Sequence, residues 1–367
     1  MQQAAILEAF ADLPDQRRRQ GRRHSLPLCL ALFTLAVAAG NQGFLAIGDW
    51  LKSYCEQLSE LFGVEEHCLP SYSTIRRTLL SIEYQDYAAS LAKFFNICPE
   101  AGETIAVDGK VAKGSFMVEK DNPNCESHPA IMLVSAYLVE RGLILQLYEV
   151  DRKTNEIKAL PELIKNLALK GVVFTFDAMN TQKKTCQLIV ESENDYIGAL
   201  KGNQPGLLKE VKANFTSAET TQQLNKGHGR IEKRTVSICR TLEDIRAWPG
   251  LRTIIRVESE RQIIKGELLI GSKQVHYYIS SLTESVQQIA QRVRGYWGVE
   301  NRVHYVRDVT QGEDASRIRT TPLVQLWALA RNFALNSYRA FGFKNIAQAY
   351  RKCAFGLDIL KTLFRMK

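Results

Sequence analysis

The 367-residue sequence lacks the features that mark several special classes of protein. Its eight cysteines include no C-x-x-C pair, so no zinc ribbon or thioredoxin-like redox motif is indicated. Their scatter is typical of a reducing compartment, where cysteines serve as small apolar side chains. The most apolar run, Leu26–Ala39, spans 14 residues, whereas a membrane span needs about 20. We therefore expect a buried helix there, no membrane partner and a cytoplasmic location.

The composition is that of an ordinary globular protein. Hydrophobic residues make up 45% and charged residues 24% of the chain, which excludes a mainly disordered protein. The length indicates about two or three domains. A formal net charge of +9 favours a polyanionic partner, for which DNA, RNA and an anionic membrane surface are the candidates.

Residues 1–98 are predicted to form a helical, DNA-binding domain. Pro70–Ser73 supplies a helix start signal, and the next helix carries Arg76 and Arg77 beside an apolar face. A short helix with exposed arginines after a turn could lie on DNA. The alternative is that both arginines belong to a solvated helix face.

From residue 99 to 225 the pattern predicts alternating strands and helices. The expected strands are Thr104–Val107, Ile131–Val139, Leu143–Val150, Val172–Phe176 and Tyr196–Leu200, and the expected helices are Leu160–Leu169 and Thr181–Ser192. This order indicates a mixed sheet with crossover helices, and therefore an α/β fold.

Residues 226–284 interrupt this alternation and are predicted to form a β-rich insertion. The expected strands are Thr235–Ile238, Leu251–Val257, Ile263–Ile270 and His276–Ile279. Residues 285–367 return to a helical pattern, with one helix over Val286–Arg307 and others after Thr321.

Two aspartates follow apolar strands and are the first candidates for a functional site. Asp108 comes after Ile105–Val107, and Asp177 comes after Phe174–Phe176. The carboxyl ends of strands are where sites form in α/β sheets. Neighbouring carboxylates repel one another unless a cation lies between them, and Mg²⁺ prefers oxygen ligands. A turn or cap role is the alternative for either aspartate alone.

Glu300 is the third candidate. Ile289, Val293, Tyr296 and Glu300 recur at helical spacing and share one face, which places the carboxylate where the helix meets the sheet. A charge there is costly unless it is paired or metal-bound. Arg307 continues the face and could bind a phosphate. The alternative for Glu300 is a salt bridge at the helix end.

Several short motifs, in this order and spacing, resemble those of one protein family. They are Ala106–Lys110, Lys153–Ile157, Thr175–Met179, Ala199–Gln204, His228–Arg230, Tyr278–Ser281, Trp297–Asn301 and Gly312–Asp314. Over nearly its whole length the chain resembles bacterial insertion-sequence transposases of the H-repeat-associated kind, which are DDE enzymes with an RNase H-like fold.

The resemblance implies a catalytic triad of Asp108, Asp177 and Glu300 that binds Mg²⁺, with Mn²⁺ as a substitute. It implies hydrolysis of phosphodiesters at the element ends, followed by transfer of the freed 3′-hydroxyl into target DNA. Double-stranded DNA is the expected partner, and synapsis of two ends implies a homodimer. The β-rich insertion separates the second aspartate from the glutamate.

Other polar residues are expected to contact DNA. Besides Arg76 and Arg77, the candidates are Lys110, Lys113, Lys201, Asn203, Gln204, Arg230, Arg294, Asn301, His304 and Arg307. For the lysines after Asp108 a solvated loop is the alternative, and for the motif containing Arg230 the alternative is a turn.

Two other functions remain open at this point. The first is a non-catalytic DNA-binding relic of a transposase, although such a relic should have lost a carboxylate of the triad. The second is a general RNase H-like nuclease or resolvase, which would need neither the amino-terminal helices nor the β-rich insertion.

Overall fold

The computed structural model describes residues 5–65, 69–118, 127–150, 156–227, 230–265 and 268–365. The strands are β1 (Thr104–Ala112), β2 (Ile131–Leu138), β3 (Leu143–Glu149), β4 (Val173–Phe176), β5 (Asp195–Leu200), β6 (Glu219–Gly227), β7 (Arg230–Cys239), β8 (Thr253–Lys265) and β9 (Leu268–Ser280). The helices are α1 (Ala5–Ala9), α2 (Leu26–Ala38), α3 (Phe44–Ser53), α4 (Cys55–Phe62), α5 (Tyr72–Leu79), α6 (Tyr84–Phe95), α7 (Glu156–Leu167), α8 (Lys183–Glu191), α9 (Pro205–Asn214), α10 (Val286–Val299), α11 (Leu323–Ala340), α12 (Ile346–Ala354) and α13 (Asp358–Leu363).

The described strands form one mixed sheet in the order β3-β2-β1-β4-β5-β9-β8-β7-β6. Strand β2 is antiparallel to both of its neighbours, β3 and β1, while β4 is parallel to both β1 and β5. The part β3-β2-β1-β4-β5, with crossover helices α7 and α8, confirms the predicted α/β, RNase H-like fold.

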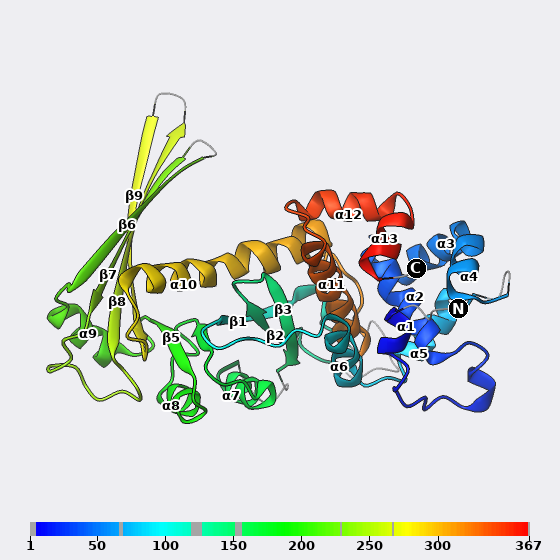
Figure 1. The fold of residues 1–367 in the computed structure, drawn as a ribbon, viewed down its shortest axis with the longest axis horizontal. Helices are drawn as coiled ribbons and strands as arrows, with labels where there is room; N and C mark the ends of the chain where they lie inside the picture. The colour runs from blue at the N-terminus through cyan, green and yellow to red at the C-terminus, as the bar shows by residue number, and fades with distance from the viewer. Residues whose placement is uncertain are drawn as a thin grey trace.

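Helices cover both faces of the sheet (Figure 1). On one face α7, α8 and α9 pack against inward side chains that include Ile105, Val107 and Phe174. On the other face α10 packs through Ile289 and Val293 against β4, β5 and the strands beyond them. Successive side chains of a strand point to opposite faces of the sheet. Every second residue of a strand therefore lies on the face that α10 covers.

Strands β6 to β9 extend the sheet beyond β5 and project from one end of the molecule (Figure 1). The segment Ile263–Ile270, expected as one strand, instead forms the end of β8 and the start of β9, which pair antiparallel. Apolar residues at the end of β8 and at the start of β9 make the two strands look like a single run in the sequence. β6 begins at Glu219, before residue 226, and its alternating polar pattern gave no strand signal.

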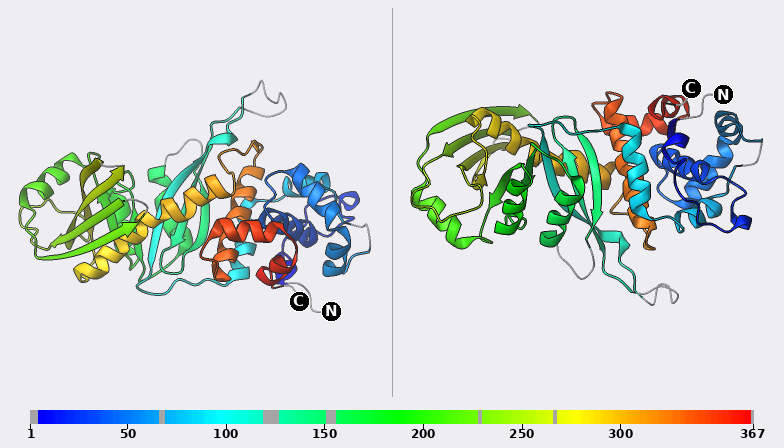
Figure 2. Two further views of the ribbon diagram at one scale, coloured as in Figure 1. Left: turned by 90° about the horizontal axis from the view of Figure 1, so that it is seen from above. Right: turned by 60° about the horizontal axis from the view of Figure 1, so that its bottom comes forward.

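The amino-terminal helices lie at the opposite end, together with α11, α12 and α13 (Figures 1 and 2). Helix α2 is buried along its length apart from Pro27, as its apolar sequence predicts, and it packs within the same core as α11. Within the described ranges, no helix is both long and apolar enough to cross a membrane.

Candidate active site

Strand β1 carries Asp108 at its fifth position, whereas we predicted that the strand ends before it. The parallel pairing with β4 covers only Thr104 to Ala106, but the antiparallel pairing with β2 continues to Ala112. After residue 106, therefore, β1 pairs with β2 on one edge but no longer with β4 on the other. Because this part of the strand is less enclosed by the sheet, it tolerates polar side chains. Alternation places Asp108 on the same face as Ala106, which is the face covered by α10.

Asp177 follows the last residue of β4 directly, as predicted. Its Oδ1 accepts hydrogen bonds from the backbone N of Asn180 at 2.9 Å and from Asn180 Nδ2 at 3.0 Å. The Thr181 hydroxyl donates to the backbone oxygens of both Asp177 and Ala199, so the turn after β4 is tied to β5. Asp177 is thus held at the strand end, on the α10 side of the sheet.

Glu300 lies at the end of α10. The helix begins with a capping box, in which the side chains of Ser285 and Gln288 each accept a bond from the other's backbone N–H. From Glu300 onward the predicted helix continues as two π-helical turns, η4 (Glu300–His304) and η5 (Val306–Thr310). The wider turn is seen directly in the bond from Tyr305 N to Glu300 O. Such turns are rare and are frequent at functional sites.

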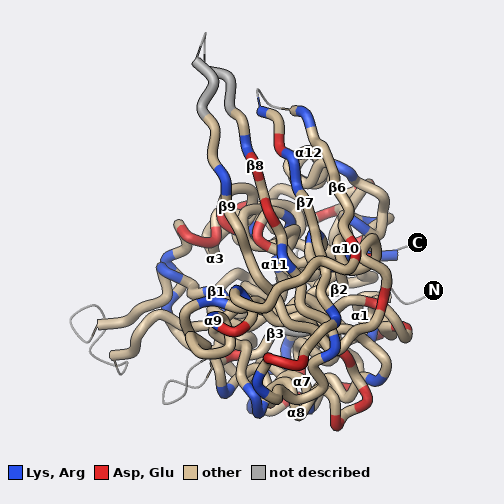
Figure 3. The backbone as a smooth tube through the Cα atoms, turned by 90° about the vertical axis from the view of Figure 1, so that its left-hand side faces the viewer, with Lys and Arg blue, Asp and Glu red and all other residues tan. Residues whose placement is uncertain are grey.

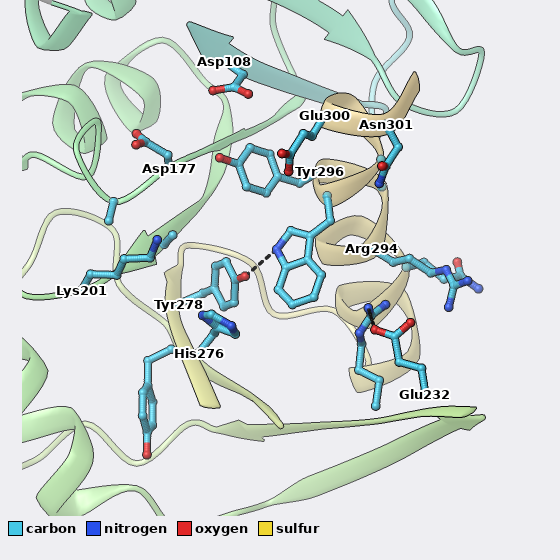
Figure 4. Close-up of a pocket in the computed structure, with 18 of the residues that line it drawn as sticks. Asp108, Asp177, Lys201, Glu232, His276, Tyr278, Arg294, Tyr296, Glu300 and Asn301 are labelled. Carbon is cyan, nitrogen blue, oxygen red and sulfur yellow. Dashed lines mark hydrogen bonds and ion pairs between the residues drawn. The ribbon is translucent and has the colours of Figure 1, made fainter. Parts of the chain in front are cut away.

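The three carboxylates line one cleft of about 790 Å³ between α10, the ends of β4 and β5, and strands β7 to β9, and the cleft reaches Arg230, the first residue of β7. Figure 4 shows Asp108, Asp177 and Glu300 on the same side of this cleft, with the Tyr296 ring between Asp177 and Glu300. The cleft also contains Glu232 and six cationic side chains, which are Lys201, Arg230, Arg234, Arg261, Arg294 and Arg302. Cationic side chains therefore line the same cleft as the carboxylates, an arrangement that suits a polyanionic substrate.

The donor set fits hard divalent cations, which prefer carboxylate oxygens. Three carboxylates from three different elements line one cleft, and like charges that approach one another repel unless a cation lies between them. In the described part of the chain, no three His, Cys, Asp or Glu side chains already lie close enough together to hold an ion. The carboxylates share the cleft, therefore, without forming a closed ligand set.

His304 lies beside the first aspartate, with Nδ1 3.5 Å from Oδ2 of Asp108. Burial, reinforced by the charges of Arg307 and Lys110, lowers the pKa of His304 to about 4. The ring is therefore neutral at pH 7 and contacts Asp108 without a full charge. This position next to a candidate carboxylate differs from the DNA contact that we expected.

One wall of the cleft is built from aromatic and cationic side chains of α10, β7 and β9. Trp297 Nε1 donates to the Tyr278 hydroxyl at 2.8 Å (dashed line in Figure 4). The Arg234 guanidinium stacks 4.6 Å from the centre of a Trp297 ring. The His276 ring meets Trp297 edge-on, with centroids 5.5 Å apart. These contacts fix the base of the projecting strands against the helix that carries Glu300.

Of the expected DNA contacts, four line the cleft, namely Lys201, Arg230, Arg294 and Asn301. Two others hold loops together instead. Asn203 Nδ2 donates to Ala178 O, and Gln204 Nε2 donates to Thr181 O at 3.1 Å. Both bonds connect the loop after β5 to the turn that carries Asp177. These two side chains therefore hold the two loops of the cleft wall together.

Lys110 and Arg307 do not reach the cleft surface as we expected. The Arg307 side chain is fully buried and Lys110 is 9% exposed, and both pair with the buried carboxylate of Glu313. A phosphate could not approach either cation without breaking these pairs. Lys113 is exposed, but it pairs with Asp314 at 2.8 Å.

Arg76 and Arg77 lie on α5, in the helical end of the molecule, as the sequence predicts. Ser71 caps this helix by accepting a bond from Thr74 N. Arg77 lines a separate pocket of about 480 Å³ with Arg17 and Arg23. This second basic surface is far from the cleft along the molecule (Figure 1).

Sequence reasoning missed several cleft residues. Arg234, Arg261, His276 and Tyr278 come from strands whose pairing partners were not known. The alternation Arg230, Glu232, Arg234 could have indicated one charged strand face, and Figure 3 shows the Lys and Arg positions on these strands. The motif residues His228 and Gly229, and residues 153–155 of another motif, lie outside the described part of the chain.

Comparisons with known proteins agree with this arrangement. The family described as "Transposase DDE domain" matches residues 99–337, and the family described as "DDE_Tnp_1-associated" matches residues 7–95. YncI of Escherichia coli O157:H7, named as a transposase, is 31% identical over 350 residues, covering 91% of this chain and 87% of that protein.

Two further similarities were found. YhhI of Escherichia coli (strain K12), named as an H repeat-associated transposase, is 29% identical over 349 residues, covering 92% of this chain and 90% of that protein. A cryo-EM structure of a piggyBac transposase synaptic complex with hairpin DNA covers 99% of this chain and 77% of that chain. Its identity is 12% and its TM-score is 0.41, which is too low to define a fold.

Proposed function

The chain belongs to the family of DDE transposases, and from this premise we propose that Asp108, Asp177 and Glu300 form its catalytic centre. The observation that supports the assignment is their common cleft, since residues separated by up to 192 positions line one basic cavity. The chain is an insertion-sequence transposase, and its DNA substrate accounts for the cations around the carboxylates.

The proposed reaction has two stages at the same carboxylates. Water first attacks a phosphodiester at each element end, which breaks a P–O bond and frees a 3′-hydroxyl. That hydroxyl then attacks a phosphodiester of target DNA, so that one P–O bond forms as another breaks. Mg²⁺, or Mn²⁺ in its place, would supply Lewis-acid activation of the attacking oxygen and stabilise the leaving oxygen. Catalytic geometry frequently tightens only with substrate, and here DNA would complete the ligand set.

The chain's own residues would bind and orient the DNA. Lys201, Arg230 and Arg294 line the cleft and would meet backbone phosphates, and Asn301, the residue after Glu300, would also contact the DNA. Arg76 and Arg77 would contact the element end through the amino-terminal domain. We further propose that the protein acts in the bacterial cytoplasm, and that two copies pair to hold two ends.

The test is to map new DNA ends. A plasmid that carries the gene with its native flanking DNA is incubated with the purified protein and Mg²⁺, and the 3′-hydroxyl ends are located. Cuts at the element boundaries should require both Mg²⁺ and Glu300. Glu300→Gln should abolish them, while Glu232→Gln, a change to another carboxylate of the same cleft, should not.

Two outcomes would contradict the proposal. Boundary binding without cutting would indicate a protein that binds DNA without catalysis. Cutting without regard to the boundaries would indicate a general nuclease.

A further inference from the structure

A group of charged side chains, all buried except the partly exposed Asp308, lies on the elements of Asp108 and Glu300 and is not used by the reaction above. We call it the charge cluster, and it consists of Lys110, Arg307, Asp308, Glu313 and Arg331. Its members come from β1, from η5, from the loop after η5, and from α11. It includes the glutamate of the Gly312–Asp314 motif, for which the sequence suggested no role.

Glu313 is the centre of the charge cluster. Its Oε2 accepts a bond from Lys110 Nζ at 2.7 Å, and its Oε1 accepts one from Arg307 at 2.6 Å. Arg331 lies 3.5 Å from the same Oε1. Lys110 also contacts Asp308. One carboxylate, 3% exposed, therefore meets three cations from three separate elements.

The balance of charge keeps Glu313 ionised. Burial alone would raise the pKa of this carboxyl group, but Arg307, Arg331 and Lys110 outweigh burial and hold the pKa well below its usual range. A buried carboxylate without partners would be strongly unfavourable. The three cations and Glu313 therefore depend on one another to stay buried.

The charge cluster joins the two elements that carry two of the candidate carboxylates. Lys110 lies two residues after Asp108 and on the same face of β1. Arg307 and Asp308 lie one turn beyond η4, which begins at Glu300. The bridge from Lys110 to Glu313 and Asp308 therefore connects the strand of Asp108 to the helical segment of Glu300.

The backbone around Glu313 is packed closely against the end of β1. A Cβ atom on Gly114 would lie 2.0 Å from the backbone oxygen of Ser316. Gly312 has a left-handed φ of +63°, and Glu313 N donates to Arg307 O at 3.0 Å. With such close contacts, a displacement of β1 or of η5 would disturb the other.

We propose that Lys110 and Glu313 are positioning residues, which fix the strand of Asp108 relative to the helical segment of Glu300, so that both carboxylates can take part in binding divalent ions. This inference rests on the proposed function of those carboxylates. Stability alone is a weaker explanation, because apolar replacements of buried ion pairs are often neutral or stabilising. A phosphate-binding role is disfavoured by the burial of Lys110, whose neighbour Lys113 is exposed.

The test measures Mn²⁺ binding to the full, DNA-free chain by water-proton relaxation. Lys110→Met removes the bridge but leaves Glu313 paired with Arg307 and Arg331. Lys113→Met is the matched control, because it removes a lysine of the same segment whose side chain is 72% exposed. Circular dichroism and thermal unfolding establish that each variant is folded.

Lys110→Met is expected to weaken Mn²⁺ binding by about tenfold or more, as changes behind metal ligands commonly do. Lys113→Met should bind as the wild type does, and Lys110→Arg should recover most of the affinity. DNA affinity without divalent ions should be unchanged in Lys110→Met, whereas a lost phosphate contact would lower the salt slope by about 1. If Lys110→Met fails to fold, Glu313→Asp carries the same expectation, since it keeps the charge but shortens the side chain.

Wild-type Mn²⁺ affinity in folded Lys110→Met would overturn the inference. Equal losses in Lys110→Met and Lys113→Met would also overturn it, because they would show a general effect of charge. A different variant tests the catalytic assignment itself. If Asp108→Asn leaves the Mn²⁺ affinity of the chain unchanged, then Asp108 is not a metal ligand and the proposed function fails.

Discussion

A Cβ atom on Gly295 of α10 would lie only 2.2 Å from Cγ1 of Val139, the residue that follows β2. The helix therefore lies against the β2–β3 turn with no room for a methyl group. Gly295 precedes Glu300 by five residues, so this contact sets how closely the Glu300 helix approaches the sheet that carries Asp108.

Gly295→Ala should destabilise the protein by about 1–3 kcal/mol, because the stiff Val139 side chain would have to move. The rate of end cleavage should also fall, because a shift of α10 would move Glu300 at its end. Gly298→Ala is the control, because its Cβ would meet Arg302 Cδ at an ordinary 3.7 Å. In a helix that change should be neutral or stabilising by up to about 1 kcal/mol. Thermal unfolding and end cleavage measure both, and equal results for the two variants would contradict this account.

Asp177→Asn should lower end cleavage by about a thousandfold or more. The loss follows because several kcal/mol of charge stabilisation depend on that carboxylate, and each 1.4 kcal/mol is about tenfold in rate. Binding to element ends should change little. Asp195→Asn, at the start of β5 and away from the cleft, should retain activity. Strong cleavage by Asp177→Asn would remove this residue from the catalytic centre.

The charge cluster predicts a pH dependence of stability. The pKa of Glu313 is lowered in the folded chain, so its contribution is fully present above its unfolded value, near 4.5, and is lost as pH falls through the folded value. At pH 7, Glu313→Gln should cost about 3–5 kcal/mol, because three buried cations lose their partner.

Thermal midpoints of the wild type and Glu313→Gln, measured from pH 7 to pH 3, should therefore converge as the pH falls below about 4.5. Glu210→Gln serves as the control, because its pair with Arg246 lies at the surface and should contribute much less. A difference that stays constant down to pH 3 would show that the charge of Glu313 is not what stabilises the fold.

Arg76→Ala combined with Arg77→Ala should weaken binding to element ends. If both arginines contact phosphates, the slope of log affinity against log salt should fall by about 2. Lys52→Ala with Lys93→Ala removes the same charge from exposed positions of the same domain and is the control. Equal affinities and equal slopes for the two double variants would show that Arg76 and Arg77 belong to a solvated helix face and do not contact DNA.

Much of the sheet was predictable, because its apolar runs alternate with helical periodicity in the order β-β-β-α-β-α-β. The position of Asp177 after β4 follows from such a run. The extension of β1 through Asp108 was not predictable, because it depends on pairing with β2 after the partner β4 has diverged. A polar stretch of a strand with one neighbour looks like a loop in the sequence.

The charge cluster was also invisible in the sequence. Lys110, Arg307 and Glu313 are joined only by tertiary packing, and each alone has the appearance of a solvated or phosphate-binding side chain. The helical spacing from Glu300 predicted which face of the helix carries Arg307. It did not predict that the Glu313 carboxylate already pairs with Arg307 there. Both residues are arginines, but Arg307 is buried and paired with Glu313, whereas Arg294 lines the cleft.

The most direct test of the catalytic assignment is to locate Mn²⁺ by anomalous diffraction in crystals of the full chain bound to a mapped element end. We predict two ions about 3.5–4 Å apart, with carboxylate oxygens of Asp108, Asp177 and Glu300 as their protein ligands. Ions bound elsewhere, or a Glu300 carboxylate that takes no part in binding them, would contradict the account.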